Sequence, residues 1–356
     1  MHRTEIPVDA MAVLKRGAVI PAHLLALDAR RELDPRHQRA LTRYYLDAGA
    51  GGLAVGVHST QFAIRGAGLY EPVLELAMQT AREWVPLGGQ RALFMSAGLA
   101  GRTAHAVHEA QIARGLGYHA GLLSLAAMKG AREDELIAHC QAVADVMPLI
   151  GFYLQPAVGG LELPAHFWRR FAAIDNVVAI KMAPFNRYRT LDVIRGVVEA
   201  GAEDRITLYT GNDDHIVLDL LAPFVVRRGQ HDVKVHIQGG LLGHWSVWTQ
   251  RAVELLARLH AARGAGSVDP ALLALDSKVT DCNAALFDVA HGFAGCIAGC
   301  HEVLRRQGLL QGTWCLDPAE GLSPGQAEEL DRVCAAYPEL VDDDFVAAHR
   351  QRWLAD

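Results

Sequence analysis

The sequence predicts an α/β fold, a (β/α)8 TIM barrel with a C-terminal helical extension. Short apolar runs alternate with longer amphipathic segments eight times between residues 17 and 262, which is the period of a barrel of eight strand–helix units. No G-x-G-x-x-G turn follows these runs, although such a turn is typical of a doubly wound sheet that binds a dinucleotide. After residue 270 the patterns are helical.

The predicted strands are short apolar runs that end at turn residues. The sixth is the clearest, because Val177, Val178 and Ile180 are β-branched and Pro184 ends the run after Lys181. The eight strands are predicted at residues 17–27, 52–56, 91–96, 119–124, 148–153, 176–181, 206–210 and 233–237.

The predicted helices are amphipathic segments with start and stop signals. The first begins at the acidic N-cap Asp34, has Pro35 in its first turn and stops at Gly49, as is typical of helix ends. The barrel helices are predicted at residues 34–48, 70–84, 102–115, 132–146, 164–173, 187–200, 213–221 and 243–262.

The clearest linker is the segment Ala-Ala-Arg-Gly-Ala-Gly-Ser-Val-Asp-Pro at residues 261–270, since Gly, Ser and Pro interrupt helices. It predicts a catalytic barrel over residues 1–264 and a C-terminal helical extension over residues 265–356. Within the extension, helices are predicted at residues 271–290, 296–307 and 324–337.

Composition excludes several classes of partner. The formal net charge of −6 is spread along the chain without a basic block, which argues against nucleic-acid binding. No apolar run is long enough to span a membrane, and the first residues lack the apolar core of a signal peptide. The six cysteines form no C-x-x-C pair and indicate reduced thiols. We therefore expect a cytoplasmic protein that binds neither nucleic acid nor a membrane.

Lys181 is the residue that suggests a chemistry. The chain has only five lysines among its 34 basic residues, and this one ends an apolar strand, where the mouth of a barrel lies. Burial disfavours the charged amine and lowers its pKa, and a neutral amine is what a Schiff-base nucleophile needs. The alternative is a lysine whose amine reaches solvent or an ion pair.

Further candidates follow from the rule that strand ends surround one mouth. A lysine, a tyrosine and a serine there suit imine chemistry, because the amine attacks a carbonyl while the hydroxyls move protons. A tyrosine at a strand end is otherwise an amphipathic aromatic with its hydroxyl in water. The candidates, in strand order, are His58, Ser59, Ser96, Ser124, Tyr153, Lys181, Gly211 and Gln238.

Several of these motifs resemble those of one family. Tyr153-Leu-Gln-Pro156 and Val177-Val-Ala-Ile-Lys181, with Lys181 28 positions after Tyr153, resemble paired strands of the dihydrodipicolinate synthase / N-acetylneuraminate lyase family. These are class I Schiff-base aldolases built on a (β/α)8 barrel. Gly211-Asn-Asp-Asp214 resembles the family's glycine-aspartate turn, and His58-Ser-Thr-Gln61 lies where the family has a hydroxyl-rich loop.

The resemblance implies a role for each matched residue. Lys181 is implied to form the Schiff base, Tyr153 to act as general acid and base, and Ser59 to relay protons to Tyr153. His58 would hold the carboxylate of a 2-oxo acid, unless it is a structural loop histidine. We also expect Gly211 and Gln238 to bind substrate.

The implied enzyme is a lyase or aldolase that acts on pyruvate or a related small 2-oxo acid, by aldol cleavage, condensation or dehydration. It needs no cofactor and no metal. Family members assemble from identical subunits, so a homo-oligomer, a dimer or a tetramer, is expected here.

The chain departs from the dihydrodipicolinate-forming members in two segments. They carry an arginine shortly after the tyrosine, where this chain has Ala157-Val-Gly-Gly160, and a tyrosine pair where it has Ser124-Leu-Ala-Ala-Met128. Neither valine nor glycine replaces a bidentate carboxylate clamp. We therefore do not expect the lysine-biosynthesis reaction.

Two other functions stay open from the sequence. A metal-dependent barrel lyase would use Asp213, Asp214 and a histidine, and a chelator would inactivate it. A non-catalytic small-molecule-binding relic of the fold would bind oxo acids without turnover. Fold alone does not decide between them.

Overall fold

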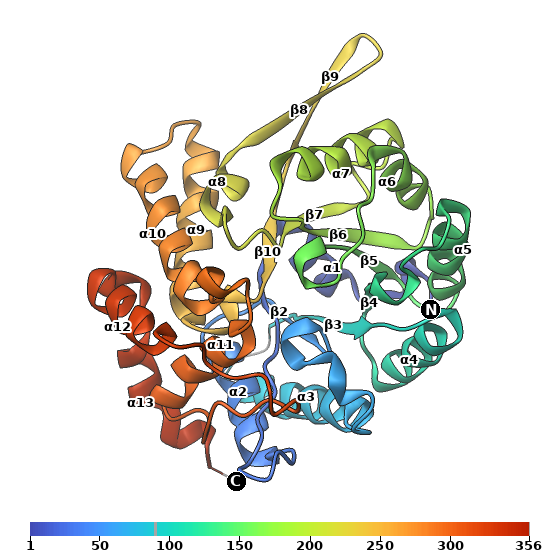
Figure 1. The fold of residues 1–356 in the computed structure, drawn as a ribbon. Coiled ribbons are helices and arrows are strands. Elements are labelled where there is room, and N and C mark those ends of the chain that lie inside the picture. The colour runs from blue at the N-terminus through green and yellow to red at the C-terminus, as the bar shows by residue number, and fades with distance from the viewer. Residues whose placement is uncertain (89–90, 356) are drawn as a thin grey trace.

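In the computed structural model, which describes residues 1–88 and 91–355, eight parallel strands form a nearly closed barrel surrounded by helices (Figure 1). The hydrogen-bonded order is β1-β10-β7-β6-β5-β4-β3-β2, and a bridge between Ala22 and Ala54 joins β1 to β2. The predicted fold class is confirmed. The barrel strands are β1 (Val19–Pro21), β2 (Gly52–Val55), β3 (Phe94–Leu99), β4 (Ala120–Leu123), β5 (Leu149–Leu154), β6 (Val177–Ala183), β7 (Thr207–Thr210) and β10 (Gly239–Leu242).

Helices cover the outside of the barrel in the predicted alternation. The first of them begins as the sequence predicts, with the Asp34 carboxylate accepting a hydrogen bond from the backbone N–H of His37. None of the described helices is both long and apolar enough to cross a membrane. The barrel helices are α2 (Pro35–Asp47), α3 (Tyr70–Trp84), α4 (Thr103–Leu116), α5 (Glu133–Ala144), α6 (Ala165–Ala172), α7 (Arg187–Glu199), α8 (Ile216–Leu221) and α9 (Thr249–Ala265).

A helix that the sequence analysis missed closes the N-terminal end of the barrel. This is α1 (Val8–Arg16), which lies behind the strands in Figure 1. Its Val13 and Leu14 belong to the apolar cluster that fills the barrel interior. The hydroxyl of Tyr209 on β7 donates to the carbonyl of Leu14 at 2.9 Å. With one end closed, the carboxyl ends of the strands form the open mouth.

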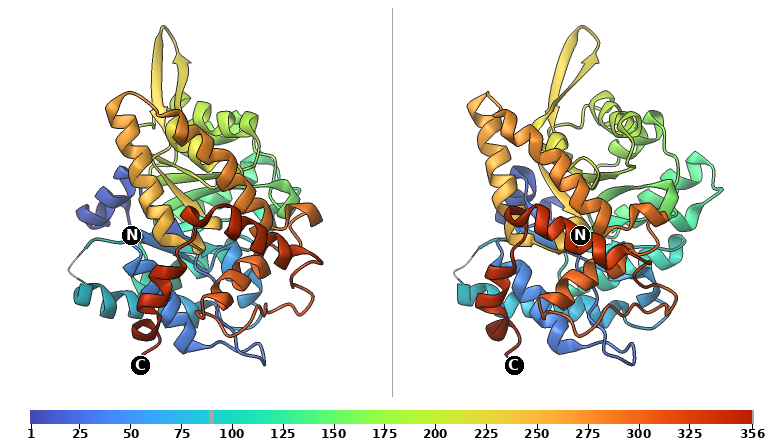
Figure 2. Two further views of the ribbon diagram at one scale, coloured as in Figure 1. Left: turned by 90° about the vertical axis from the view of Figure 1, so that its left-hand side faces the viewer. Right: turned by 60° about the vertical axis from the view of Figure 1, so that its left-hand side comes forward.

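The eighth barrel strand differs from the prediction. Residues 233–236 belong to β9 (His231–His236), which pairs antiparallel with β8 (Pro223–Arg228) in a hairpin that projects from the body (Figure 2). The alternating pattern of this segment is typical of a strand with one covered face. The true barrel strand, β10, is rich in glycine and so gives a weak strand signal. A Cβ on Gly239 would lie 2.5 Å from the carbonyl oxygen of Ala18.

The third strand begins three residues later than predicted, at Phe94. Ser96 therefore lies inside the strand, fully buried, and its hydroxyl donates to the carbonyl of Leu53. It is a core residue and does not reach the mouth.

The C-terminal helices pack against the barrel and share its outer apolar core. The last one, α13, was not predicted. Its Trp353 donates to Asp47 of α2 at 2.7 Å. Because α9 continues to Ala265, the predicted boundary at residue 264 falls in its last turn, and a division into two units stays a prediction. The helices are α10 (Pro270–Leu286), α11 (Cys296–Arg306), α12 (Gln326–Ala336) and α13 (Asp343–Trp353).

The close approach at β10 gives a stability prediction. We expect Gly239→Ala to lower the free energy of unfolding by about 1–3 kcal/mol, because the new methyl group would overlap backbone atoms. Gly115→Ala on α4 is the control, since a Cβ there meets nothing within 4 Å and alanine favours a helix. Thermal denaturation of both variants is the measurement. Equal melting temperatures would contradict the packing described for β10.

Candidate active site

Lys181 lies inside the barrel near the carboxyl end of β6, with only 8% of its surface exposed. Its amine sits over the ring of Phe152 on β5, 4.6 Å from the ring centroid. Burial lowers the pKa of the Lys181 amine, and the negative charge of Asp213 offsets part of that effect. The sequence-based prediction of a buried, weakly basic lysine at the barrel mouth agrees with this geometry.

The space for the Lys181 side chain depends on Gly211, which follows β7. A Cβ at this position would lie 2.5 Å from Cε of Lys181 and 2.8 Å from Cβ of Ala183. The Gly211 backbone N–H donates to the carbonyl of Met182 at 2.7 Å, which holds the turn against β6. Gly211 therefore lines the same pocket as Lys181, as expected.

Asp213 brings a buried carboxyl group to the Lys181 pocket. One of its oxygens accepts a hydrogen bond from the backbone N–H of His244 at 2.9 Å. Burial raises the pKa of Asp213, against the smaller effect of the positive charge of Lys181. Desolvation thus brings the pKa values of the amine and the carboxyl group close together, so that the two groups titrate as a coupled pair.

The two aspartates of this turn, Asp213 and Asp214, are the carboxylates of the metal-dependent alternative. In the structure α8 begins after His215 without a side-chain cap, and Asp214 is exposed. Within residues 1–88 and 91–355, no group of three or more His, Cys, Asp or Glu side chains is arranged to hold a metal ion.

The loop after β2 brings His58 and Ser59 to the pocket. Thr60 fixes the loop, because its hydroxyl donates to the carbonyl of His23 at 2.6 Å and accepts from the backbone N–H of Gly56. Burial, with a smaller effect of the Lys181 charge, lowers the pKa of His58 to about 4. At neutral pH His58 therefore offers a neutral imidazole and Ser59 a hydroxyl.

The prediction that Tyr153 lies beside Lys181 is wrong. Side chains alternate between the two faces of a strand, and Phe152 is the residue in register with Lys181. Tyr153 points outward to the helix layer, where its ring lies 5.4 Å from that of Trp168. Its hydroxyl accepts a hydrogen bond from the backbone N–H of Leu163 at 3.1 Å.

Gln238 also lies away from the pocket. It precedes β10, at the N-terminal end of the barrel, because the glycine-rich segment after it is the strand and not the turn that follows one. Its side-chain oxygen accepts from Arg263 at 3.1 Å, and its carbonyl accepts from His260 at 2.7 Å. The expectation that Gln238 reaches a substrate at the mouth is therefore wrong.

The rest of the pocket is mostly apolar, with Gln155 as an exception, and includes residues that the sequence analysis missed. Phe152 was missed because the face of β5 that meets Lys181 depends on the pairing of β5 with β6. Phe287, Phe293 and Cys296 come from the segment around the start of α11, and no local pattern predicts that this segment folds over the mouth. The remaining lining residues are Ala22, Val57, Leu154, Gln155, Val158, Ala183, Phe185 and Gly243.

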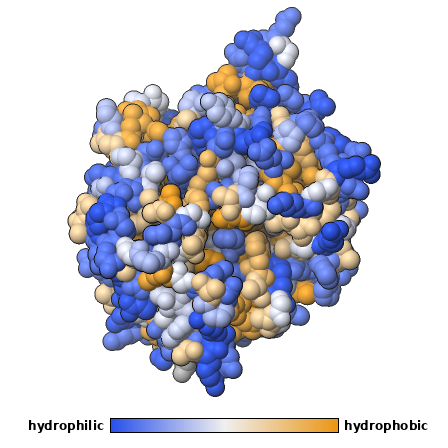
Figure 3. Space-filling view, in the orientation of Figure 1, coloured by the Kyte–Doolittle hydropathy of each residue, from blue (hydrophilic) through white to orange (hydrophobic). Residues whose placement is uncertain are grey.

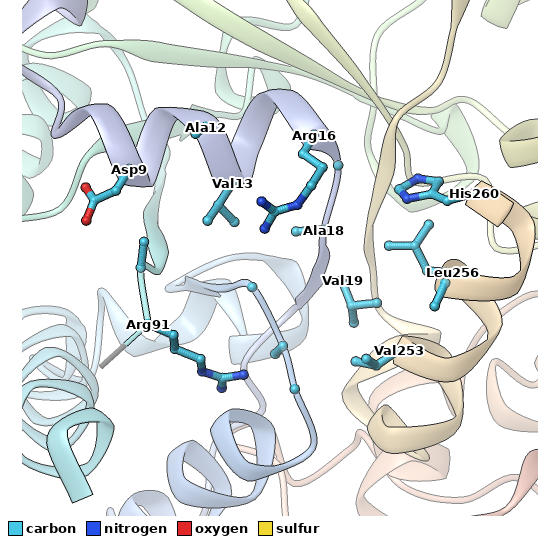
Figure 4. Close-up of a pocket in the computed structure, with 16 residues that line it drawn as sticks. Asp9, Ala12, Val13, Arg16, Ala18, Val19, Arg91, Val253, Leu256 and His260 are labelled. Atoms are coloured by element: carbon cyan, nitrogen blue, oxygen red, sulfur yellow. The ribbon is translucent and has the colours of Figure 1, made fainter. Parts of the chain in front are cut away.

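A larger cavity, of about 490 Å³, lies at the opposite end of the barrel. Figure 4 shows the side chains of Arg16 and Arg91 directed into it, with apolar residues of α1 and α9 around them. In this fold the chemistry lies at the carboxyl ends of the strands and the other end serves stability. The narrower Lys181 pocket is therefore the candidate active site.

Comparisons with known proteins place the chain among relatives with this fold. The profile of the "Dihydrodipicolinate synthetase family" matches residues 15–336. A 4-hydroxy-tetrahydrodipicolinate synthase from Desulforudis audaxviator is 28% identical over 250 residues, which are 69% of this chain and 79% of the relative.

Solved structures of the same family are similar in fold. Dihydrodipicolinate synthase from Oceanobacillus iheyensis gives a TM-score of 0.72 at 16% identity, covering 93% of this chain and 99% of that one. A prophage protein of the family from E. coli K12, in complex with pyruvate, gives 0.71 at 19% identity, covering 92% and 99%. A monomeric dihydrodipicolinate synthase variant gives 0.72 at 18% identity, covering 94% and 99%.

The position of Tyr153 predicts that its hydroxyl contributes to the stability of the fold and not to the reaction of Lys181. We expect Tyr153→Phe to lower the free energy of unfolding by about 1–3 kcal/mol, because the backbone N–H of Leu163 loses its buried acceptor. Reaction of Lys181 with an oxo acid should be unchanged. Chemical denaturation and borohydride trapping on the same preparation are the measurements. A stable variant that no longer traps an oxo acid would contradict the outward position of Tyr153.

Proposed function

The chain belongs to the dihydrodipicolinate synthetase family, whose members are lyases and synthases of the class I aldolase type, and on this premise we propose that it is a lyase forming an imine between Lys181 and pyruvate or a related 2-oxo acid. The observation that carries the proposal is the buried, weakly basic amine of Lys181 at the barrel mouth beside the carboxyl group of Asp213. The relative solved in complex with pyruvate supports the choice of substrate.

In the proposed reaction the neutral amine of Lys181 attacks the ketone carbon, and water leaves with the help of a proton from Asp213. The protonated imine then withdraws electrons from the neighbouring carbon. This permits a carbon–carbon bond to break or form, or water to be expelled. Asp213 takes the proton-transfer role that the resemblance gave to Tyr153, since a buried carboxyl group with a raised pKa can both donate and accept near neutral pH.

His58 and Ser59 are proposed to hold the carboxylate of the oxo acid. A neutral imidazole N–H and a hydroxyl are both hydrogen-bond donors, and both residues line the pocket. The relay from Ser59 to Tyr153 is not part of the proposal, because Tyr153 faces the helix layer.

The condensation performed by the family's namesakes is not proposed for this chain. Val158 lines the pocket in the segment where those members carry an arginine, so the second carboxylate of their substrate has no clamp here. The expected dimer or tetramer also stays a prediction, because the structural relatives include a monomeric variant.

Borohydride trapping with pyruvate tests the proposal. We expect a stable adduct on the peptide that carries Lys181, found by mass spectrometry and absent in Lys181→Ala. Lys234→Ala is the control, since Lys234 is exposed on the projecting hairpin. No adduct with pyruvate or other 2-oxo acids would contradict the imine. Trapping without turnover of any oxo-acid adduct would favour the binding-only alternative.

The pH dependence of trapping tests the role of Asp213. The negative charge of Asp213 raises the pKa of Lys181, so Asp213→Asn should lower that pKa and move the pH profile of trapping to lower pH. Turnover of an aldol substrate should fall by about 10²–10⁴-fold, the usual contribution of a general acid or base.

Asp214→Asn is the matched control, because Asp214 is exposed and does not line the pocket. It should leave the trapping profile nearly unchanged. A profile of Asp213→Asn that stays in place or moves to higher pH would contradict the pairing of Asp213 with Lys181.

A further inference from the structure

Phenylalanine side chains make up much of the lining of the Lys181 pocket. They come from distant parts of the chain: Phe152 from β5, Phe185 after β6, and Phe287 and Phe293 from the segment between α10 and α11. Leu154 and Val158 complete this wall. Figure 3 shows the face of the molecule that contains the mouth, where apolar and hydrophilic residues are interspersed.

Two of these phenylalanines are held in a costly backbone conformation. Phe185 has φ +51° and Phe293 has φ +73°, a region that residues other than glycine seldom adopt. Their rings meet edge to face, with centroids 6.0 Å apart. Such strain persists only where surrounding structure maintains it, and it clusters at ligand sites.

Hydrogen bonds maintain both positions. The backbone N–H of Phe185 donates to the side chain of Asn212 at 3.0 Å, and that of Phe293 donates to the carbonyl of Asp288 at 3.0 Å. The Asp288 carboxylate accepts from the backbone N–H of Gly295 and from the hydroxyl of Ser323. The aromatic wall is therefore positioned from both sides of the mouth.

The pocket that this wall lines has few side chains that could pair with a second negative charge. Lys181 is the one lysine among the described lining residues, and no arginine is among them. In the protonated imine the positive charge of Lys181 lies next to the first carboxylate of the substrate, and His58 is neutral. A second carboxylate on the substrate would therefore be desolvated without a cation of its own, which is unfavourable. An apolar group would instead gain contact with the rings.

We propose that the part of the substrate beyond the 2-oxo acid is uncharged and apolar, an aryl or branched alkyl group, so that the aldehyde released or condensed is apolar. This inference rests on the proposed imine chemistry. In the cleavage direction the bond between C3 and C4 breaks and its electron pair enters the protonated imine. Asp213 takes the proton of the C4 hydroxyl as the aldehyde forms. The enamine carbon then takes a proton back, and water hydrolyses the imine to free pyruvate.

A matched pair of ligands tests the proposal without requiring turnover. The 2-oxo acids 2-oxo-4-phenylbutanoate and 2-oxoglutarate share the reacting end and differ in a terminal phenyl group or carboxylate. We expect borohydride trapping on Lys181 to reach half-saturation at a concentration at least about tenfold lower for the phenyl compound. Equal or tighter trapping of 2-oxoglutarate would overturn the inference, as would trapping of pyruvate with neither of the two.

A charge introduced into the wall gives the complementary test. Phe293→Arg should shift the preference toward 2-oxoglutarate by at least about tenfold, because a guanidinium would pair with its second carboxylate. Leu273→Arg is the control, since Leu273 is exposed on α10 and does not line the pocket. An unchanged preference in Phe293→Arg would count against the wall as the selecting surface. Failure of pyruvate itself to trap would instead overturn the imine chemistry.

Discussion

Burial of the Lys181 amine beside the Asp213 carboxyl group is the interaction on which the barrel mouth depends. An isolated charge inside a barrel is strongly disfavoured, and the opposite charges of Lys181 and Asp213 offset part of that cost for each other. Gly211 makes the arrangement sterically possible, because a side chain there would overlap Lys181. The result is a buried amine with a lowered pKa and a buried carboxyl group with a raised pKa in one pocket.

Strand register decides which aromatic residue accompanies the lysine. Phe152 pairs with Lys181 across β5 and β6, and the register shifts near Leu149 and Ile150. A shift of one residue exchanges the two faces of a strand, so the motif that resembles the family's tyrosine places its hydroxyl in the helix layer. The candidate site therefore has a buried lysine with a phenyl ring beside its amine.

The general fold and the lysine were predictable because both rest on patterns that are local in the sequence. Alternating strands and helices predict a barrel, and a lysine that ends an apolar run predicts a buried amine near the mouth. The errors concern properties that depend on tertiary context. Because β10 is rich in glycine, its sequence gives a weak strand signal. The face of β5 from which Tyr153 projects depends on the pairing of β5 with β6. The aromatic wall from residues 287–296 depends on packing between segments far apart in the chain.

The C-terminal region contributes to the candidate active site as well as to the core. Phe287 and Phe293 reach the Lys181 pocket from this region, while Trp353 and Asp342 anchor it to α2 through Asp47 and Tyr44. The C-terminal extension thus lines the mouth and also packs against the barrel helices.

The most direct test of this account is a crystal structure of the borohydride-reduced pyruvate adduct. We expect continuous density from Nζ of Lys181 to the second carbon of the pyruvate group, with the Asp213 carboxyl group and the Phe152 ring next to it. The Tyr153 hydroxyl should remain with the backbone N–H of Leu163. An adduct on another residue, or a Tyr153 hydroxyl turned toward the reduced imine, would contradict the account.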